Sequence, residues 1–158
     1  MEKKKFYLTK QKLKELKQEY ESLVAFEKSK TIGEEAPRVL ESEDLNPEFL
    51  SFQEDMSFLR SKIIELENVL SNHELIKNPS HQDKNIIGLG AKVLVSINGK
   101  KDEFVIMGTL EANPSLGKIS NESPVGKALI GHKAGEEVVV SSPIKTIYKI
   151  KKIKYLSS

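Results

Sequence analysis

Eight carboxylate side chains crowd residues 33–55, and they are the groups of this sequence best suited to chemistry. Only one base, Arg38, lies among them. Carboxylate oxygens are the ligands that Mg²⁺ prefers, and this ion usually binds one or two of them while keeping other oxygen ligands. A partial magnesium site is therefore one interpretation, and a solvated acidic turn is the simpler alternative that the spacing leaves open. The acids are Glu34, Glu35, Glu41, Glu43, Asp44, Glu48, Glu54 and Asp55.

The charge of the chain is segregated along its length. The net charge is only +2, yet residues 1–33 carry +4, residues 34–55 carry −7 and residues 56–158 carry +5. Blocks of this kind usually mark interaction segments rather than a uniformly solvated surface. We therefore treat the acidic stretch as the candidate working end of the molecule.

Two helical segments flank the acidic stretch and would position it. Thr9 is a candidate N-cap of the first helix, and Pro37 ends or interrupts that helix. Asn46 and Pro47 are typical of the N-cap and first residue of a second helix. The short connection favours a long antiparallel hairpin, a coiled coil with its acidic tip near residues 36–48. The apolar seams are Leu13, Leu16, Tyr20 and Leu23, then Phe49, Phe52, Met56, Leu59, Ile63, Leu66 and Leu70.

The second half of the chain has the pattern of a small β-rich domain. Residues 77–86 are polar and contain a proline, so they predict a linker between a hairpin domain, 1–76, and a second domain, 87–158. Short strand-like segments and one short helix predict a small antiparallel sheet, which makes the fold class α+β. We expect strands at 91–97, 104–110, 137–141 and 146–155, the last with a bulge, a type I′ turn at Asn98-Gly99, and a helix at 123–131 with Ser123 as N-cap and Pro124 first.

Composition excludes several classes of protein and site. The absence of cysteine excludes disulfides and thiolate chemistry. No apolar run is long enough for a membrane span, and the N-terminus lacks the apolar core of a signal peptide, so we expect a cytoplasmic protein that has no membrane partner. The histidines have no metal-ligand spacing, and a group of lysines in the last strand would either contact phosphates or form a solvated face. These residues are His73, His81 and His132, and Lys149, Lys151, Lys152 and Lys154.

The chain resembles the bacterial Gre transcript-cleavage factors, a family of transcription elongation factors. Residues 119–140, ISNESPVGKALIGHKAGEEVVV, follow the family pattern of Ile-Ser, Ser-Pro, Ala-Leu-Ile-Gly, Lys, Gly and a Glu-Val-rich strand. The order of hairpin, acidic tip, linker and β-rich domain also matches. The resemblance covers nearly the whole chain.

The resemblance implies a function that composition alone does not. The C-terminal domain would be similar to FK506-binding proteins (FKBP-like) and would dock beside the secondary channel of RNA polymerase, while the hairpin enters that channel. Its tip would help to hold a catalytic Mg²⁺ that is shared with the polymerase active site and not stably bound by the factor alone. Backtracked nascent RNA is then hydrolysed near its 3′ end. The protein would thus be a monomeric cofactor of the polymerase nuclease and not itself an enzyme.

The resemblance also implies roles for individual acids. Asp44 matches the metal-binding aspartate of the family. The family places a second acid three residues later, where this sequence has Pro47. Either Glu48 or Glu43 would then supply the second carboxylate. The candidate catalytic residues are Asp44, Glu43, Glu48 and Glu41, with Asp44 and Glu48 as candidate magnesium ligands.

Three other functions stay open at this point. A secondary-channel factor with an altered tip would inhibit or modulate the polymerase without cleavage. A prolyl isomerase or chaperone module would need an aromatic-lined pocket, for which this domain offers Phe104, Tyr148 and Tyr155. A purely structural coiled-coil adaptor would explain the heptads but not the acidic tip.

Overall fold

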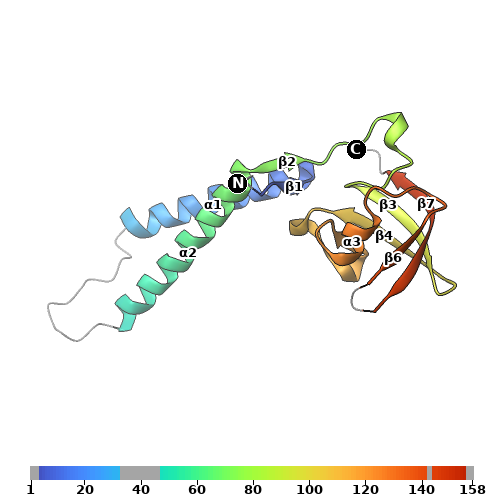
Figure 1. The fold of residues 1–158 in the computed structure, drawn as a ribbon. Coiled ribbons are helices and arrows are strands. Elements are labelled where there is room, and N and C mark those ends of the chain that lie inside the picture. Colours follow the sequence, from blue (N-terminus) through green and yellow to red (C-terminus); the bar gives the residue numbers. More distant parts are fainter. Residues whose placement is uncertain (1–3, 33–46, 142–143, 156–158) are drawn as a thin grey trace. The chain divides into compact units, whose positions relative to one another are not determined.

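The computed structural model describes residues 4–32, 47–141 and 144–155. The chain divides into two compact units (Figure 1), one containing Gln11–His73 and the other formed by Lys4–Lys10 with Glu74–Ser158. Residues that precede the first long helix thus group with the C-terminal residues. The domain bounds predicted from the sequence, 1–76 and 87–158, did not include this grouping of residues 4–10 with the C-terminal residues.

The first unit consists of two long helices, α1 (Lys10–Ile32) and α2 (Pro47–Ser71), which run in opposite directions and spread apart toward residues 33–46 (Figure 1). Thr9 directly precedes α1 and Pro47 opens α2, as the sequence predicts. The predicted apolar seam of α2 is buried over most of its length, although Val69 is buried where Leu70 is only half-buried. The buried residues of α2 are Met56, Leu59, Ile63, Leu66 and Val69.

The second unit is built on a five-stranded sheet with the order β5-β4-β3-β7-β6. The turn between β3 and β4 is the predicted type I′, because Asn98 and Gly99 have φ angles of 53° and 81°. The predicted bulge in β7 is also present, since the pairing register shifts between Leu94 and Val95 of β3. The strands are β3 (Ala91–Ile97), β4 (Lys100–Met107), β5 (Lys118–Ser120), β6 (Glu137–Val140) and β7 (Thr146–Tyr155).

Two predictions for this sheet were wrong, and a separate pair of short strands was not predicted. The strand expected at 104–110 begins at Lys100, because the two-residue turn pairs Ile97 directly with Lys100, and it ends at Met107. The sheet is mixed and not antiparallel, since β5 pairs with β4 in parallel. Two strands of three residues each, β1 (Phe6–Leu8) and β2 (His73–Leu75), pair with each other and were not predicted. Strands this short carry too few residues for an alternating pattern.

The core of the second unit lies against one face of the sheet, where α3 (Pro124–Leu129) packs. The predicted cap is present, since the Ser123 hydroxyl accepts a hydrogen bond from the Gly126 nitrogen at 3.1 Å. The helix is shorter than predicted because Ile130 already leaves the helical conformation, with ψ at 134°. Three 3₁₀ turns complete the unit: η1 (His81–Asp83), η2 (Thr109–Glu111) and η3 (Pro114–Leu116). Within the described ranges, no helix is long and apolar enough to cross a membrane.

Candidate functional site

Of the four predicted catalytic acids, Glu48 is the one that the structure describes. It is the second residue of α2 and is exposed. A carboxylate in the first turn of a helix is stabilised by the helix dipole, so this position agrees with both a structural and a metal-binding role. Asp44, Glu43 and Glu41 lie outside the described residues.

The two helices of the first unit flank the acidic segment in the chain, because α1 ends at Ile32 and α2 begins at Pro47. They are 23 and 25 residues long, which at 1.5 Å per residue is about 35 Å each. A buried cluster of α2 side chains packs against residues from both helices. The cluster is formed by Met56, Leu59 and Ile63, with Tyr20, Leu23, Val24 and Phe52 against it. This packing joins the two helices that flank the acidic segment in the sequence.

One side-chain hydrogen bond joins the helices across the seam. The Tyr20 hydroxyl donates to a carboxylate oxygen of Glu67 at 2.8 Å. This hydrogen bond is the largest cause of the raised pKa of Tyr20, because a carboxylate acceptor stabilises the protonated phenol that donates to it. The contact pairs the middle of α1 with a late turn of α2.

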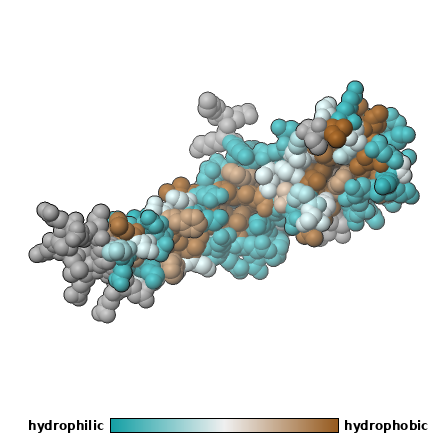
Figure 2. Space-filling model, turned by 90° about the horizontal axis from the view of Figure 1, so that it is seen from below, coloured by the Kyte–Doolittle hydropathy of each residue, from teal (hydrophilic) through white to brown (hydrophobic). Residues whose placement is uncertain are grey.

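Apolar packing becomes looser toward the ends of the helices that adjoin residues 33–46. Phe26 is 52% exposed and Leu50 is 38% exposed. The Lys30 ammonium lies 5.4 Å from the Phe26 ring centre, so a cation covers part of this ring. Figure 2, which views the molecule from below, shows hydrophobic residues exposed between hydrophilic ones. Exposed apolar residues are therefore close in the sequence to the acidic stretch.

A second polar cluster lies where β1 contacts η2, and we call it the β1 anchor (Lys4, Thr9, Thr109, Glu111, Ser120 and Glu122). The Glu111 carboxylate accepts hydrogen bonds from the Thr9 nitrogen at 2.9 Å and the Thr9 hydroxyl at 2.7 Å. Gly108 has no room for a side chain, since a Cβ atom there would lie 2.0 Å from the Tyr7 carbonyl oxygen. These contacts hold β1 against η2 directly before α1 begins.

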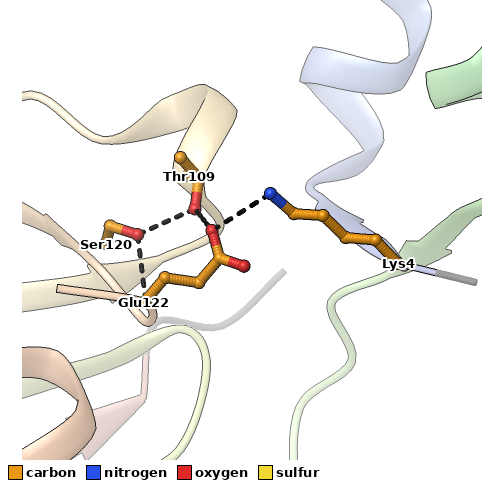
Figure 3. Close-up of polar contacts among 4 residues, drawn as sticks. All are labelled: Lys4, Thr109, Ser120 and Glu122. Carbon is orange, nitrogen blue, oxygen red and sulfur yellow. Dashed lines mark hydrogen bonds and ion pairs between the residues drawn. The ribbon is translucent and has the colours of Figure 1, made fainter. Parts of the chain in front are cut away.

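The other half of the β1 anchor is centred on Glu122 (Figure 3). Its Oε2 accepts a hydrogen bond from the Thr109 hydroxyl at 2.5 Å and lies 3.6 Å from the Lys4 ammonium. The Ser120 hydroxyl accepts a hydrogen bond from the Glu122 nitrogen at 3.0 Å. The Thr109 bond, and to a lesser degree the Lys4 charge, hold the pKa of Glu122 below its ordinary value. Sequence reasoning missed the β1 anchor because its partners lie far apart in the sequence, 102 residues in the case of Thr9 and Glu111.

Two of the histidines have local partners. The His132 ring nitrogen Nδ1 lies 2.8 Å from Glu136 Oε2, and the His73 Nδ1 lies 2.7 Å from the Leu70 carbonyl oxygen. The pKa of Glu136 is lowered, first by the Lys133 backbone N–H and then by His132. Among the residues that the structure describes, no group of three or more histidine and acidic side chains could hold a metal ion.

The aromatic residues considered for an isomerase pocket are half-buried and pack against the core. The rings of Phe104 and Tyr148 stack with their centres 6.3 Å apart. The Tyr155 hydroxyl donates a hydrogen bond to the Ile86 carbonyl at 2.6 Å. Burial raises the pKa of both tyrosines. Packing and one internal hydrogen bond account for these side chains without an isomerase site.

Known proteins resemble this chain over most of its length. The family described as "Transcription elongation factor, GreA/GreB, C-term" matches residues 82–155. The transcription elongation factor GreA of Acetivibrio thermocellus is 38% identical over 155 residues, which cover 96% of this chain and 97% of that protein. The chain belongs to the GreA/GreB family. GreA of Thermomicrobium roseum is 37% identical over 142 residues, or 89% of this chain and 90% of that protein.

The Gre family assignment confirms the resemblance found in the sequence. The matched residues 82–155 contain η1, the five-stranded sheet, α3 and the segment 119–140. Among solved structures, GreA factor homolog 1 of Thermus thermophilus aligns over 96% of this chain and 99% of that chain, with 22% identity and a TM-score of 0.41. The family assignment rests on the sequence relatives.

Proposed function

We propose that this Gre protein binds RNA polymerase through the secondary channel and stimulates magnesium-dependent cleavage of backtracked nascent RNA. It acts in the cytoplasm as a monomeric cofactor, and the polymerase carries out the hydrolysis. The observation that carries the proposal is that two long, packed helices flank the acidic segment in a member of a transcription elongation family. Helices about 35 Å long suit the task of carrying carboxylates into another protein's active site.

The donor chemistry of the acidic segment fits Mg²⁺, because carboxylate oxygens are its preferred protein ligands. We assign Asp44 as the first ligand and Glu48 as the second, with Glu43 and Glu41 nearby in the sequence. Glu48 is exposed and therefore accessible to a metal. When bound, the shared ion would lower the pKa of a water molecule and stabilise charge on the attacked phosphate. The carboxylates would hold the ion and orient that water.

The C-terminal unit would dock on the polymerase. We propose that its fold is FKBP-like and that the two helices form a coiled coil. A curled sheet with a short helix against its core face supports the first point, and the heptad-spaced seam of α2 supports the second. The β1 anchor would hold β1 and the residue before α1 at this unit.

One observation favours a second candidate function, that of a secondary-channel factor that inhibits or modulates the polymerase without cleavage. Pro47, which stands three residues after Asp44, is the first residue of α2. A proline supplies no carboxylate at the position where the family has its second acid. Without a second ligand, the hairpin would occupy the channel but hold the ion less well.

A transcript-release assay separates the two functions. The protein is added to stalled, backtracked polymerase complexes with labelled RNA, with and without Mg²⁺. Release of short 3′ fragments that depends on both the protein and the ion supports cleavage stimulation. Slower RNA synthesis with no fragments supports the second function. A protein that changes neither reaction contradicts both.

A further inference from the structure

The second unit contains a cavity of about 250 Å³ to which the proposed function assigns no role. All of its lining residues belong to this one unit. Four segments that are far apart in the sequence contribute to the lining: Tyr7 of β1, residues 74–79, which begin in β2, residues 88–89, and Tyr155 at the end of β7. We call this space the β2 cavity.

Hydrogen bonds hold the walls of the β2 cavity in place. On one side β1 pairs with β2, and the Ile76 nitrogen donates to the Leu8 carbonyl oxygen at 2.9 Å. On the other side the Tyr155 hydroxyl donates to the Ile86 carbonyl oxygen at 2.6 Å. The two sides meet at Gly90, where an added Cβ atom would lie 3.3 Å from the Ile76 side chain. A ligand would therefore enter a largely preformed site, which lowers the cost of binding.

The lining is mostly apolar and aromatic. Its side chains include Tyr7, Leu75, Leu89 and Tyr155, which are half-buried and so keep accessible surface. An apolar cavity of about 150 Å³ accommodates benzene, whereas sites for drug-sized ligands measure about 300–1,000 Å³. The volume of the β2 cavity thus suits one aromatic ring or two fused rings. Two tyrosine rings in the lining favour such a ligand, because aromatic groups attract one another in stacked and edge-to-face arrangements.

Two charged side chains, Glu74 and Lys77, also line the β2 cavity. The Glu74 carboxylate is already compensated, since its Oε2 lies 3.2 Å from the Lys5 ammonium. Lys77 is exposed and forms no ion pair with any residue in the described ranges. The charge left without a partner in the lining is therefore positive. A ligand with one anionic group would complement it.

We propose that the β2 cavity binds a small aromatic carboxylate, with the ring among the apolar side chains and the carboxylate beside Lys77. A single lysine does not match the several charges of a nucleotide, and the volume is small for one. The proposal goes beyond polymerase binding and does not depend on it. Because the ligand would contact both the β1–β2 pair and the end of β7, its binding should stabilise the second unit.

The test is a titration of the full-length, ¹⁵N-labelled protein with indole-3-acetate, followed by NMR without polymerase. Saturable shifts should be concentrated at the backbone amides of Leu75, Lys77 and Leu89. Gly99 should be unaffected, because it follows the other end of β3 from the one that pairs with Tyr155. For a ligand of about a dozen non-hydrogen atoms, we expect a Kd of about 1 mM or lower. Shifts that do not saturate by about 10 mM, ten times this value, would overturn the proposal.

Two further probes separate the ring from the charge. Acetate has the carboxylate without the ring and should bind at least about 10-fold more weakly, because it buries little apolar surface. Tryptamine has the same ring with an ammonium group and should bind at least about 3-fold more weakly, because like charges would meet at Lys77. Binding of either probe as tight as that of indole-3-acetate would overturn the proposal.

Variants test the role of the lysine. Lys77→Gln should weaken indole-3-acetate binding about 3-fold, the scale of an exposed ion pair, and Lys77→Arg should retain it. Lys100→Gln is the matched control, an exposed lysine at the far end of β3, and should bind as the wild type does. Equal affinities of Lys77→Gln and Lys100→Gln would overturn the proposal. The same amide shifts on concentrating the protein alone would also overturn it, because a second copy would then occupy the cavity. Thermal unfolding verifies that each variant is folded.

Discussion

Thr9 and Glu111 are 102 residues apart in the sequence, yet the Glu111 carboxylate accepts two hydrogen bonds from Thr9. One comes from the backbone nitrogen at 2.9 Å and the other from the hydroxyl at 2.7 Å. Because α1 begins at the next residue, Lys10, this pair fixes the chain at the point where the long helix starts. Both residues belong to the second unit, so the β1 anchor holds Lys4–Lys10 to the rest of that unit.

The first prediction concerns this pair. Glu111→Gln keeps the size of the side chain but removes the charge and one of two acceptor oxygens. A hydrogen bond to a charged group contributes about 1.5–3 kcal/mol, and a neutral one about 1 kcal/mol. We therefore expect the free energy of unfolding to fall by about 1 kcal/mol in urea titrations. Glu19→Gln, on the exposed surface of α1, should change it by less than about 0.5 kcal/mol. Equal effects would contradict the role of Glu111.

The second prediction compares neighbouring isoleucines of α2. Ile63 is 8% exposed within the helical seam, whereas Ile64 is 64% exposed. Ile63→Ala should lower the free energy of unfolding by about 2–4 kcal/mol, because it removes buried methyl groups and leaves a cavity. Ile64→Ala should cost less than about 0.5 kcal/mol. Far-UV circular dichroism during urea unfolding measures both. A cost at Ile64 equal to that at Ile63 would mean that the seam is misassigned.

The third prediction concerns the pH dependence of stability. The pKa of Glu122 is below its ordinary value of 4.5 in the folded protein. Its stabilising contribution is therefore fully present above the unfolded pKa of about 4.5 and is lost as the pH falls through the lower folded pKa. Glu122→Gln removes this titration, so its stability should decline less steeply with falling pH than that of the wild type.

Urea midpoints measured across this acidic range provide the comparison. The difference should be small, because Glu122 is exposed and surface charge contacts are screened by solvent. It should shrink further in high salt, since the Lys4 contact is electrostatic. Identical pH profiles for both proteins at low salt would exclude a contribution from Glu122.

Local patterns in the sequence predicted the local features of the fold. The heptad spacing of α2, the Asn98-Gly99 turn and the Ser123 cap each depend on residues within a few positions, and each is present. The pairing of β5 with β4 and the contacts of Glu111 join distant segments of the chain, so no pattern of neighbouring residues predicts them. The lysines of β7 were noticed in the sequence, but only the strand register shows that Lys154 lies opposite Lys92 and Lys152 opposite Leu94.

For the candidate site as well, local sequence patterns predict one part and not the other. The family pattern assigns a role to Asp44, and the proline at position 47 does begin α2 as its sequence predicts. The position of Glu48 follows directly from that helix start. The choice between Glu48 and Glu43 as the second ligand does not follow from spacing, because it depends on where a bound metal and the polymerase groups would lie. The roles of Asp44, Glu43 and Glu41 stay predictions.

The measurement that tests the central claim most directly is RNA cleavage in backtracked polymerase complexes by four proteins side by side. These are the wild type, Asp44→Asn, Glu48→Gln and Glu54→Gln, the last an exposed acid farther along α2. The wild type and Glu54→Gln should release short 3′ fragments at equal rates. Asp44→Asn should slow release on the order of 100-fold, the scale of losing one electrostatic group from an active site, while polymerase binding is retained. A loss of cleavage rate in Glu48→Gln that is smaller than the loss in Asp44→Asn would identify Glu48 as the second ligand. Undiminished cleavage by Asp44→Asn would contradict the account.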